Sequence, residues 1–170
     1  MKTMTTLLLA AYASLALFSC EKVQPAQIPE LQKEEEKKPE DNNQNYNEMT
    51  TTLYLSIDGV TKSATLVSNS STEAFVAQLQ KGDITYEAHD YGDFEKVGPL
   101  GYTFPENNTQ ITTEPGDLIL YQGSNLCIYY DTNSWNFTHI GKLDNMTQAD
   151  IKAWVIAGGG NVNVTLSLKQ

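Results

Sequence analysis

The stretch GDLILYQGSNLCIYYDTNSWNFTHIGKLD, residues 116–144, is the most informative part of the chain about its fold. It contains two strongly apolar runs separated by Gly123-Ser124-Asn125, and a third extended run over residues 136–144. Short apolar runs bounded by turn residues indicate buried β-strands. Because apolar residues occupy both faces of the first two runs, we expect these strands to lie centrally, with other structure packed on each side.

Toward the N-terminus, residues 51–67 predict a β-hairpin. Two alternating runs flank Asp58-Gly59, a pair that favours a type I′ turn because both residues tolerate positive φ. Residues 83–86 predict one more strand. The following stretch, residues 89–117, is rich in Gly, Pro and aromatic residues. A connection of this length in a compact domain is usually functional or contains short strands of its own.

Two helices are predicted, one before and one after the central strands in the sequence. The first covers residues 70–82, with Ser70 as its N-cap and Gly82 as its terminator. The second begins at Thr147 and ends at the glycines 158–160. Both carry apolar residues at helical spacing, so each is expected to cover part of a core.

The last segment, residues 161–169, alternates apolar and polar residues as a strand buried on one side does. Many short strands with one early and one late helix predict a single domain over residues 51–170. Its fold class is mainly β, a small closed barrel whose ends the two helices cap.

The charge balance of the chain excludes some partners. The formal net charge is -10, and all eleven basic residues are lysines. Nucleic-acid binding depends on clustered cations that neutralise phosphates, so we expect no nucleic-acid partner. A chain without arginine also lacks the planar, bidentate group that clamps carboxylates and phosphates.

The N-terminus has the pattern of a secretory signal. One cation, Lys2, precedes a short apolar run that ends in Leu17-Phe18-Ser19-Cys20, and this run is too short to span a bilayer. The ending resembles the lipobox of bacterial lipoproteins. The resemblance implies that residues 1–19 are a lipoprotein signal peptide and that Cys20 is lipidated. The alternative is an ordinary signal peptide with a chance cysteine.

Residues 20–50 predict a disordered acidic tether that begins at the lipidated cysteine. They are rich in Glu, Lys, Gln, Asn and Pro and have few large apolar side chains, so they cannot bury enough surface to fold. The membrane is therefore the expected partner, reached through the lipid on Cys20. We expect a monomer at the cell envelope, on the periplasmic face or the cell surface. Cys127, the other cysteine, is expected to be a small buried hydrophobe.

The motif order of residues 116–144 resembles the bacterial cyclophilin-like family. A Gly-Asp pair precedes a strand and a Gly-containing turn, and a loop with an aromatic residue leads to an Ile-Gly-Lys strand end. The upstream DYGDFEKVGPL, residues 90–100, resembles the segment that the family carries before its central strands. The resemblance covers about residues 50–170. It implies a cyclophilin-like closed barrel capped by two helices, and it does not imply cyclophilin activity.

Prolyl isomerisation is disfavoured on chemical grounds. The resemblance implies that isomerase activity would rely on an arginine that hydrogen-bonds to the twisted proline amide. This chain contains no arginine. A lysine supplies a point charge without the fixed fork of the guanidinium, and no motif places Lys96 for that role. Two other functions remain as alternatives to the binding module predicted below. One is a divergent isomerase or chaperone, and the other is an accessory enzyme or redox-associated domain.

Aromatic side chains of the long stretch and the central strands are the candidate ligand contacts. Amphipathic rings give a large contact area at low entropy cost, which suits a peptide or glycan ligand. In an extended strand His139 shares a face with Trp135 and Phe137. It could act there as a hydrogen-bonding group or a general base, or it could be a histidine satisfied by a neighbouring carboxylate. No defensible metal-ligand spacing and no cofactor motif is found. We therefore predict a non-catalytic binding or interaction module without catalytic residues, metal or cofactor. Its candidate ligand-binding residues are Tyr91, Phe94, Glu95, Tyr102, Phe104, Tyr121, Trp135, Phe137 and His139, with Tyr129 as a further aromatic on the same strands.

Overall fold

The computed structural model describes residues 51–170. The predicted signal peptide, the lipidation at Cys20 and the tether over residues 20–50 lie outside the described residues. Within them, no helix has both the length and the apolar composition that crossing a membrane requires.

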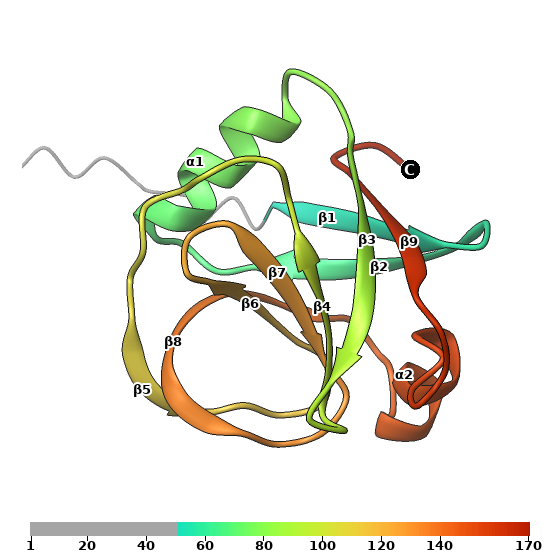
Figure 1. Ribbon diagram of the computed structural model, residues 1–170. Helices are drawn as coiled ribbons and strands as arrows, with labels where there is room; N and C mark the ends of the chain where they lie inside the picture. Colours follow the sequence, from blue (N-terminus) through green and yellow to red (C-terminus); the bar gives the residue numbers. More distant parts are fainter. Residues whose placement is uncertain (1–50) are drawn as a thin grey trace, which may run out of the picture. The chain divides into compact units, whose positions relative to one another are not determined.

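Eight antiparallel strands close into a barrel (Figure 1). The hydrogen-bonded order is β2-β1-β9-β3-β4-β7-β6-β8, and a pairing of β8 with β2 closes the ring, while β5 adds to β8 from outside. The mainly β closed barrel with two helices is therefore confirmed. The elements are β1 Thr52–Ile57, β2 Val60–Leu66, α1 Ser70–Leu79, β3 Ile84–Tyr91, β4 Glu95–Pro99, β5 Thr109–Thr112, β6 Asp117–Tyr121, β7 Asn125–Tyr129, β8 Ser134–Leu143, α2 Gln148–Trp154 and β9 Val162–Ser167.

The interior of the barrel is one apolar core to which both helices contribute. Phe75 of α1 is 0% exposed and Ile151 of α2 is 1% exposed, and both belong to the same buried cluster as the inward residues of the strands. Figure 1 shows α1 and α2 at opposite ends of the barrel. Strand β9 alternates buried and partly exposed residues as predicted, because only one of its faces meets this core.

The hairpin of β1 and β2 forms as the sequence predicts. Asp58 has φ of 49° and Gly59 has φ of 78°, so both turn residues take the left-handed conformation that a type I′ turn requires. The register pairs Ile57 with Val60 across this turn.

The predicted N-cap of the first helix is wrong by one residue. Asn69, not Ser70, has the extended backbone of the cap, and its side chain accepts a hydrogen bond from the Thr72 amide at 2.9 Å. The Asn69 side chain also donates to the His139 carbonyl at 2.9 Å, which ties the start of α1 to β8. Sequence spacing could not show this second bond, because its partner is 70 residues away.

The second helix has the predicted N-cap, Thr147, and a complete capping box with Asp150. It ends earlier than predicted, at Trp154, because Ile156 turns into the left-handed region with φ of 54° before the glycines are reached. Both helices are thus shorter at their C-termini than the glycine positions suggested.

The long stretch after residue 89 contains two strands of its own, β4 and β5. Strand β3 also runs to Tyr91, beyond the predicted end at residue 86. It is longer because it pairs with β9 over its first half and with β4 over its second half. Strand β9 is distant in sequence, and β4 lies in the stretch that is rich in glycine and proline. The local sequence pattern therefore did not indicate that β3 continues to Tyr91.

Candidate functional site

A second, smaller apolar cluster lies on the face of the central strands that does not meet the main core. It contains Ile119, Cys127, Tyr129 and Phe137. Along β6, Leu118 and Leu120 belong to the main core while Ile119 belongs to this outer cluster, as strand alternation requires. The expectation that the central strands are packed on both faces is confirmed.

A cavity of about 320 Å³ opens beside this outer cluster. That volume is at the small end of the range of ligand pockets, about 300–1,000 Å³, and suits a small molecule or a single side chain. We call it the aromatic pocket. It is lined by Tyr91, Phe94, Glu95, Val97, Tyr121, Tyr129, Asn133, Trp135 and Phe137.

Four rings form a continuous row along the pocket. The Tyr91 and Phe94 ring centroids are 5.9 Å apart in an edge contact, and Phe94 stacks on Tyr129 at 5.8 Å with an interplanar angle of 6°. Tyr129 then contacts Phe137 at 5.7 Å. Tyr129 and Phe137 are buried, whereas Tyr91 and Trp135 are each 62% exposed. The pocket therefore has a rigid buried wall and an exposed aromatic rim.

The turn between β3 and β4 places Phe94 in this row. Gly92 and Asp93 both have positive φ, of 60° and 59°. A Cβ atom at Gly92 would lie 2.2 Å from the Phe94 ring, so only glycine allows the ring to fold back over the turn. The register then pairs Glu95 with Tyr91 on one side and with Tyr129 on the other.

Glu95 is the unusual polar group of the aromatic pocket. It is 6% exposed, and its Oε2 atom is buried without a hydrogen-bond partner. Burial raises the pKa of the Glu95 carboxyl, and the Tyr129 hydroxyl and the Cys127 thiol offset only part of this increase. A buried polar atom without a partner costs about 1–3 kcal/mol and therefore requires an explanation.

Two neutral groups lie next to Glu95, the Tyr129 hydroxyl and the Cys127 thiol. Burial and the nearby carboxyl raise the pKa of the Tyr129 hydroxyl, so this group stays protonated. Cys127 is 1% exposed, and burial followed by the charge of Glu95 raises the pKa of its thiol. The thiol is thus a buried, protonated group, as the sequence predicted, and it is unsuited to nucleophilic chemistry.

Three of the nine predicted residues do not line the aromatic pocket. Phe104 is 7% exposed and packs edge-on against Phe75 of α1 at 5.6 Å, so it is a core residue. Tyr102 is exposed, and its ring centroid lies 6.4 Å from that of Phe104. His139 pairs with Asp117. The structure brings the other six together, namely Tyr91, Phe94, Glu95, Tyr121, Trp135 and Phe137.

Two lining residues, Val97 and Asn133, were missed. Val97 lies two residues after Glu95 on β4, and alternation would have found it had this strand been recognised. Asn133 precedes β8 in a loop, and no local pattern distinguishes it from neighbouring polar residues.

His139 lies at the other end of the outer face with a carboxylate partner. Its Nε2 atom is 3.5 Å from Oδ1 of Asp117. Burial raises the pKa of the Asp117 carboxyl, but the His139 imidazole and the Glu114 amide outweigh this, so that the pKa lies below its usual range. Asp117 is thus the carboxylate beside His139, but Nε2 is buried without a hydrogen-bond partner, so the expected satisfied histidine is not found.

Lys96 faces the barrel interior and is 0% exposed. Its Nζ atom donates to Oδ2 of Asp90 at 2.6 Å and to the Gly160 carbonyl at 2.8 Å, and Asp90 also accepts from the Tyr130 hydroxyl at 2.9 Å. The lysine next to the aromatic pocket in sequence is thus turned away from it. Within residues 51–170, no cluster of three His, Cys, Asp or Glu side chains could hold a metal ion.

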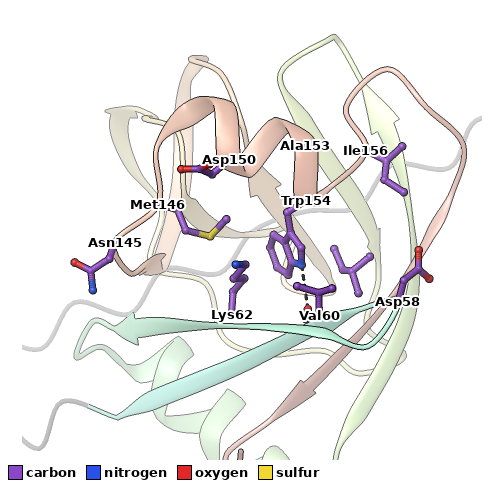
Figure 2. Close-up of a pocket in the computed structure, with 10 residues that line it drawn as sticks. Asp58, Val60, Lys62, Asn145, Met146, Asp150, Ala153, Trp154 and Ile156 are labelled. Atoms are coloured by element: carbon purple, nitrogen blue, oxygen red, sulfur yellow. Dashed lines mark hydrogen bonds between the residues drawn. The ribbon is translucent and has the colours of Figure 1, made fainter.

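A second depression, of about 500 Å³, lies between the β1–β2 turn and α2 (Figure 2). The Trp154 ring crosses it, and Nε1 donates to the Val60 carbonyl at 3.1 Å. Among the described residues, none of the buried unpartnered polar atoms belongs to the lining of this depression. The aromatic pocket, which contains one, is therefore the better candidate site.

Comparison with known proteins supports the fold. A family model described as the Cyclophilin-like family matches residues 55–167. The solution structure of the hypothetical protein AF2241 from Archaeoglobus fulgidus is similar, with a TM-score of 0.51 and 15% identity over 69% of this chain and 94% of that chain. The structure of McbB in complex with tryptophan has a TM-score of 0.52 and 17% identity over 69% of this chain and 44% of that chain. No curated protein matches the chain.

Proposed function

Because the chain belongs to the cyclophilin-like family, we propose that its barrel is a non-catalytic ligand-binding module. The aromatic pocket carries this proposal. It combines exposed rings at the rim with a buried wall and the buried carboxyl of Glu95, whose Oε2 atom has no hydrogen-bond partner. Concave, largely aromatic surfaces with few polar groups are typical of binding sites.

The side chains around the pocket favour binding over catalysis. The chain has no arginine, and Lys96 is turned into the barrel, where it pairs with Asp90. The one described thiol, Cys127, is buried. His139 lies outside the pocket lining, beside Asp117. Besides the Glu95 carboxyl, the lining of the aromatic pocket thus contains no Ser, Thr, Cys, Lys or His side chain that could act as a nucleophile or a general base.

The proposal also places the module at the cell envelope, as a monomer held by a lipid on Cys20. The lipobox-like ending at Cys20 supports this part, as does the composition of residues 20–50. The family model begins at residue 55 and β1 at Thr52, so residues 1–50 precede the barrel in sequence, as an address and a tether require. Cells that express the full chain should incorporate labelled fatty acid into it, and Cys20→Ser should abolish the label. Labelling that survives the substitution would contradict the anchor.

The two tryptophans provide a direct test of binding. Trp135 lies at the rim of the aromatic pocket, whereas Trp154 lies in the depression of Figure 2. A screen of peptides and glycans against the full chain should find a ligand that changes tryptophan fluorescence. Trp135→Phe should remove the response and Trp154→Phe should keep it. The opposite pattern would exclude the aromatic pocket as the site.

The isomerase alternative has a separate test. The full chain should not accelerate cis–trans isomerisation of a proline-containing peptide above the uncatalysed rate. Acceleration that disappears in a variant of the pocket, such as Phe137→Ala, would show that the module is catalytic and would overturn the proposal.

A further inference from the structure

On the basis of the proposed binding function, we propose that the aromatic pocket binds an organic ammonium cation, with Glu95 as its counter-ion. The ligand class is an alkylammonium group, either in a small free amine or at the end of a lysine side chain. Two observations point to it independently, the buried Glu95 carboxyl oxygen without a hydrogen bond and the arrangement of the rings.

The carboxyl of Glu95 lacks a partner of opposite charge. It is 6% exposed, and Oε2 is without a hydrogen bond. Buried charges in proteins are normally paired. The lining of the pocket contains no Lys, Arg or His side chain, and the neighbouring Lys96 is committed to Asp90 on the other face. A ligand cation would supply the missing partner.

The rings are placed to receive the same charge. The faces of aromatic rings carry negative electrostatic potential and attract cations within about 6 Å. Tyr91 and Trp135 are large aromatic residues that remain 62% exposed at the rim, and Phe94 and Tyr129 continue the row inward. An ammonium group among them would contact rings and the Glu95 carboxyl together. Its alkyl part would meet the apolar wall that Val97 and Phe137 contribute.

Anionic and neutral ligands fit this pocket less well. An anion would be repelled by Glu95 and by the net charge of -10, and the lining contains no cation to compensate. A sugar would present several hydroxyl groups, and besides Glu95 the lining offers only the Asn133 amide, the Trp135 indole N–H and the tyrosine hydroxyls. The negative charge of the chain would instead raise the local concentration of cations.

Binding of a cation should depend on pH through Glu95. Burial raises the pKa of this carboxyl. The groups that face it are the Tyr129 hydroxyl and the Cys127 thiol on β7 and, at longer range, His89 on β3. A cation favours the ionised carboxyl, so binding would lower the pKa of Glu95 and release a proton where the free carboxyl is protonated. Affinity should fall as the pH drops below the raised pKa of Glu95.

The experiment compares a cation with a neutral molecule of the same shape. The full chain is titrated at neutral pH with choline and with 3,3-dimethylbutan-1-ol, which replaces the ammonium nitrogen by carbon, and Trp135 fluorescence is followed. Choline should bind at least about tenfold more tightly, a typical effect of a counter-ion and ring faces. Glu95→Gln should weaken choline about tenfold and leave the alcohol unchanged. Glu106→Gln, an exposed carboxyl outside the pocket, should change neither.

Three further probes separate the two sources of the cation. N-acetyl-lysine amide and N-acetyl-norleucine amide test a lysine side chain, and n-butylamine tests a free amine. Tighter binding of the lysine derivative than of n-butylamine would identify a peptide or protein partner, and the reverse would identify a small amine.

The outcomes distinguish this inference from the function on which it rests. Equal binding of choline and the alcohol, or no loss in Glu95→Gln, would overturn the ammonium site while a response of Trp135 still supports a binding module. Absence of any response to these probes would also overturn the ammonium site. If the peptide and glycan screen then failed as well, the binding module itself would be wrong.

Discussion

Replacing Lys96 with methionine is expected to destabilise the barrel by about 3 kcal/mol. Lys96 is 0% exposed and donates to Asp90 at 2.6 Å and to Gly160 at 2.8 Å. Methionine has a similar volume, so the change removes charge rather than packing. Loss of one partner of a buried ion pair costs about 3–5 kcal/mol. We expect a cost at the low end of this range because the Asp90 side chain is 18% exposed and keeps its hydrogen bond from the Tyr130 hydroxyl.

A double-mutant cycle isolates the pair itself. Asp90→Asn removes the counter-charge and leaves a buried ammonium with neutral carbonyl acceptors only, so it should cost at least as much as Lys96→Met. The double variant buries no charge at this position and should cost about 2 kcal/mol less than the sum of the single changes. Urea unfolding followed by circular dichroism gives each free energy. Lys81→Met, at an exposed position, should stay within about 0.5 kcal/mol of the wild type.

The pH dependence provides a second check. Burial raises the pKa of Asp90, but hydrogen bonds from Lys96 and Tyr130 outweigh this and leave the pKa below its usual value. Such a carboxyl stabilises the fold above its unfolded-state pKa, about 3.9, and this contribution is lost as the pH falls through the lower native pKa. The gap between wild type and Lys96→Met should therefore shrink on acidification. A cost below about 1 kcal/mol at neutral pH, an additive cycle or a gap independent of pH would show that the pair is not a buried interaction.

Three further predictions concern other parts of the barrel. Gly98→Ala should cost about 3 kcal/mol, because its Cβ would lie 2.0 Å from the Glu87 carbonyl, whereas Gly160→Ala meets nothing within 4 Å; equal costs in urea unfolding would contradict this. Thr147→Ala should cost about 1 kcal/mol by removing the capping box of α2, and an unchanged melting temperature would contradict it. Glu95→Gln should stabilise the unliganded chain at neutral pH. The pKa of Glu95 is raised in the folded chain, so its contribution to stability is complete below the unfolded-state pKa and is lost as the pH rises through the native pKa. The difference from wild type should vanish in acid, and thermal unfolding across pH measures it.

Local sequence was sufficient for much of the fold. Asp58-Gly59 predicts its hairpin because positive φ at both positions is a property of those residues themselves. Thr147 predicts the start of α2 for a similar reason, since its capping partner is three residues away. The N-cap of α1 was misplaced because Asn69 and Ser70 are both good caps, and a bond from Asn69 to the distant His139 carbonyl accompanies the observed choice.

The candidate site was visible only in part. An aromatic cluster could be expected from the residues of β8 and of the turn before β4, and six of the predicted residues do line one cavity. Phe104 looked equivalent to Phe94 in sequence, yet it packs on Phe75 in the core. Both rings lie in the stretch between β3 and β5, where hydrophobicity alone cannot say which ring faces inward.

Glu95 and Lys96 show where the limit lies. Strand alternation, a local property, requires these adjacent side chains to point to opposite faces of β4. Which face is the interior depends on the pairing of β4 with β3 and β7 and on closure of the barrel through β2 and β8. Tertiary pairing therefore turned Lys96 inward to Asp90 and placed Glu95 in the aromatic pocket without a counter-ion and with Oε2 lacking a hydrogen bond. Composition, turns and caps follow from short-range chemistry, whereas the environment of a charge is created by strands that meet only in the folded chain.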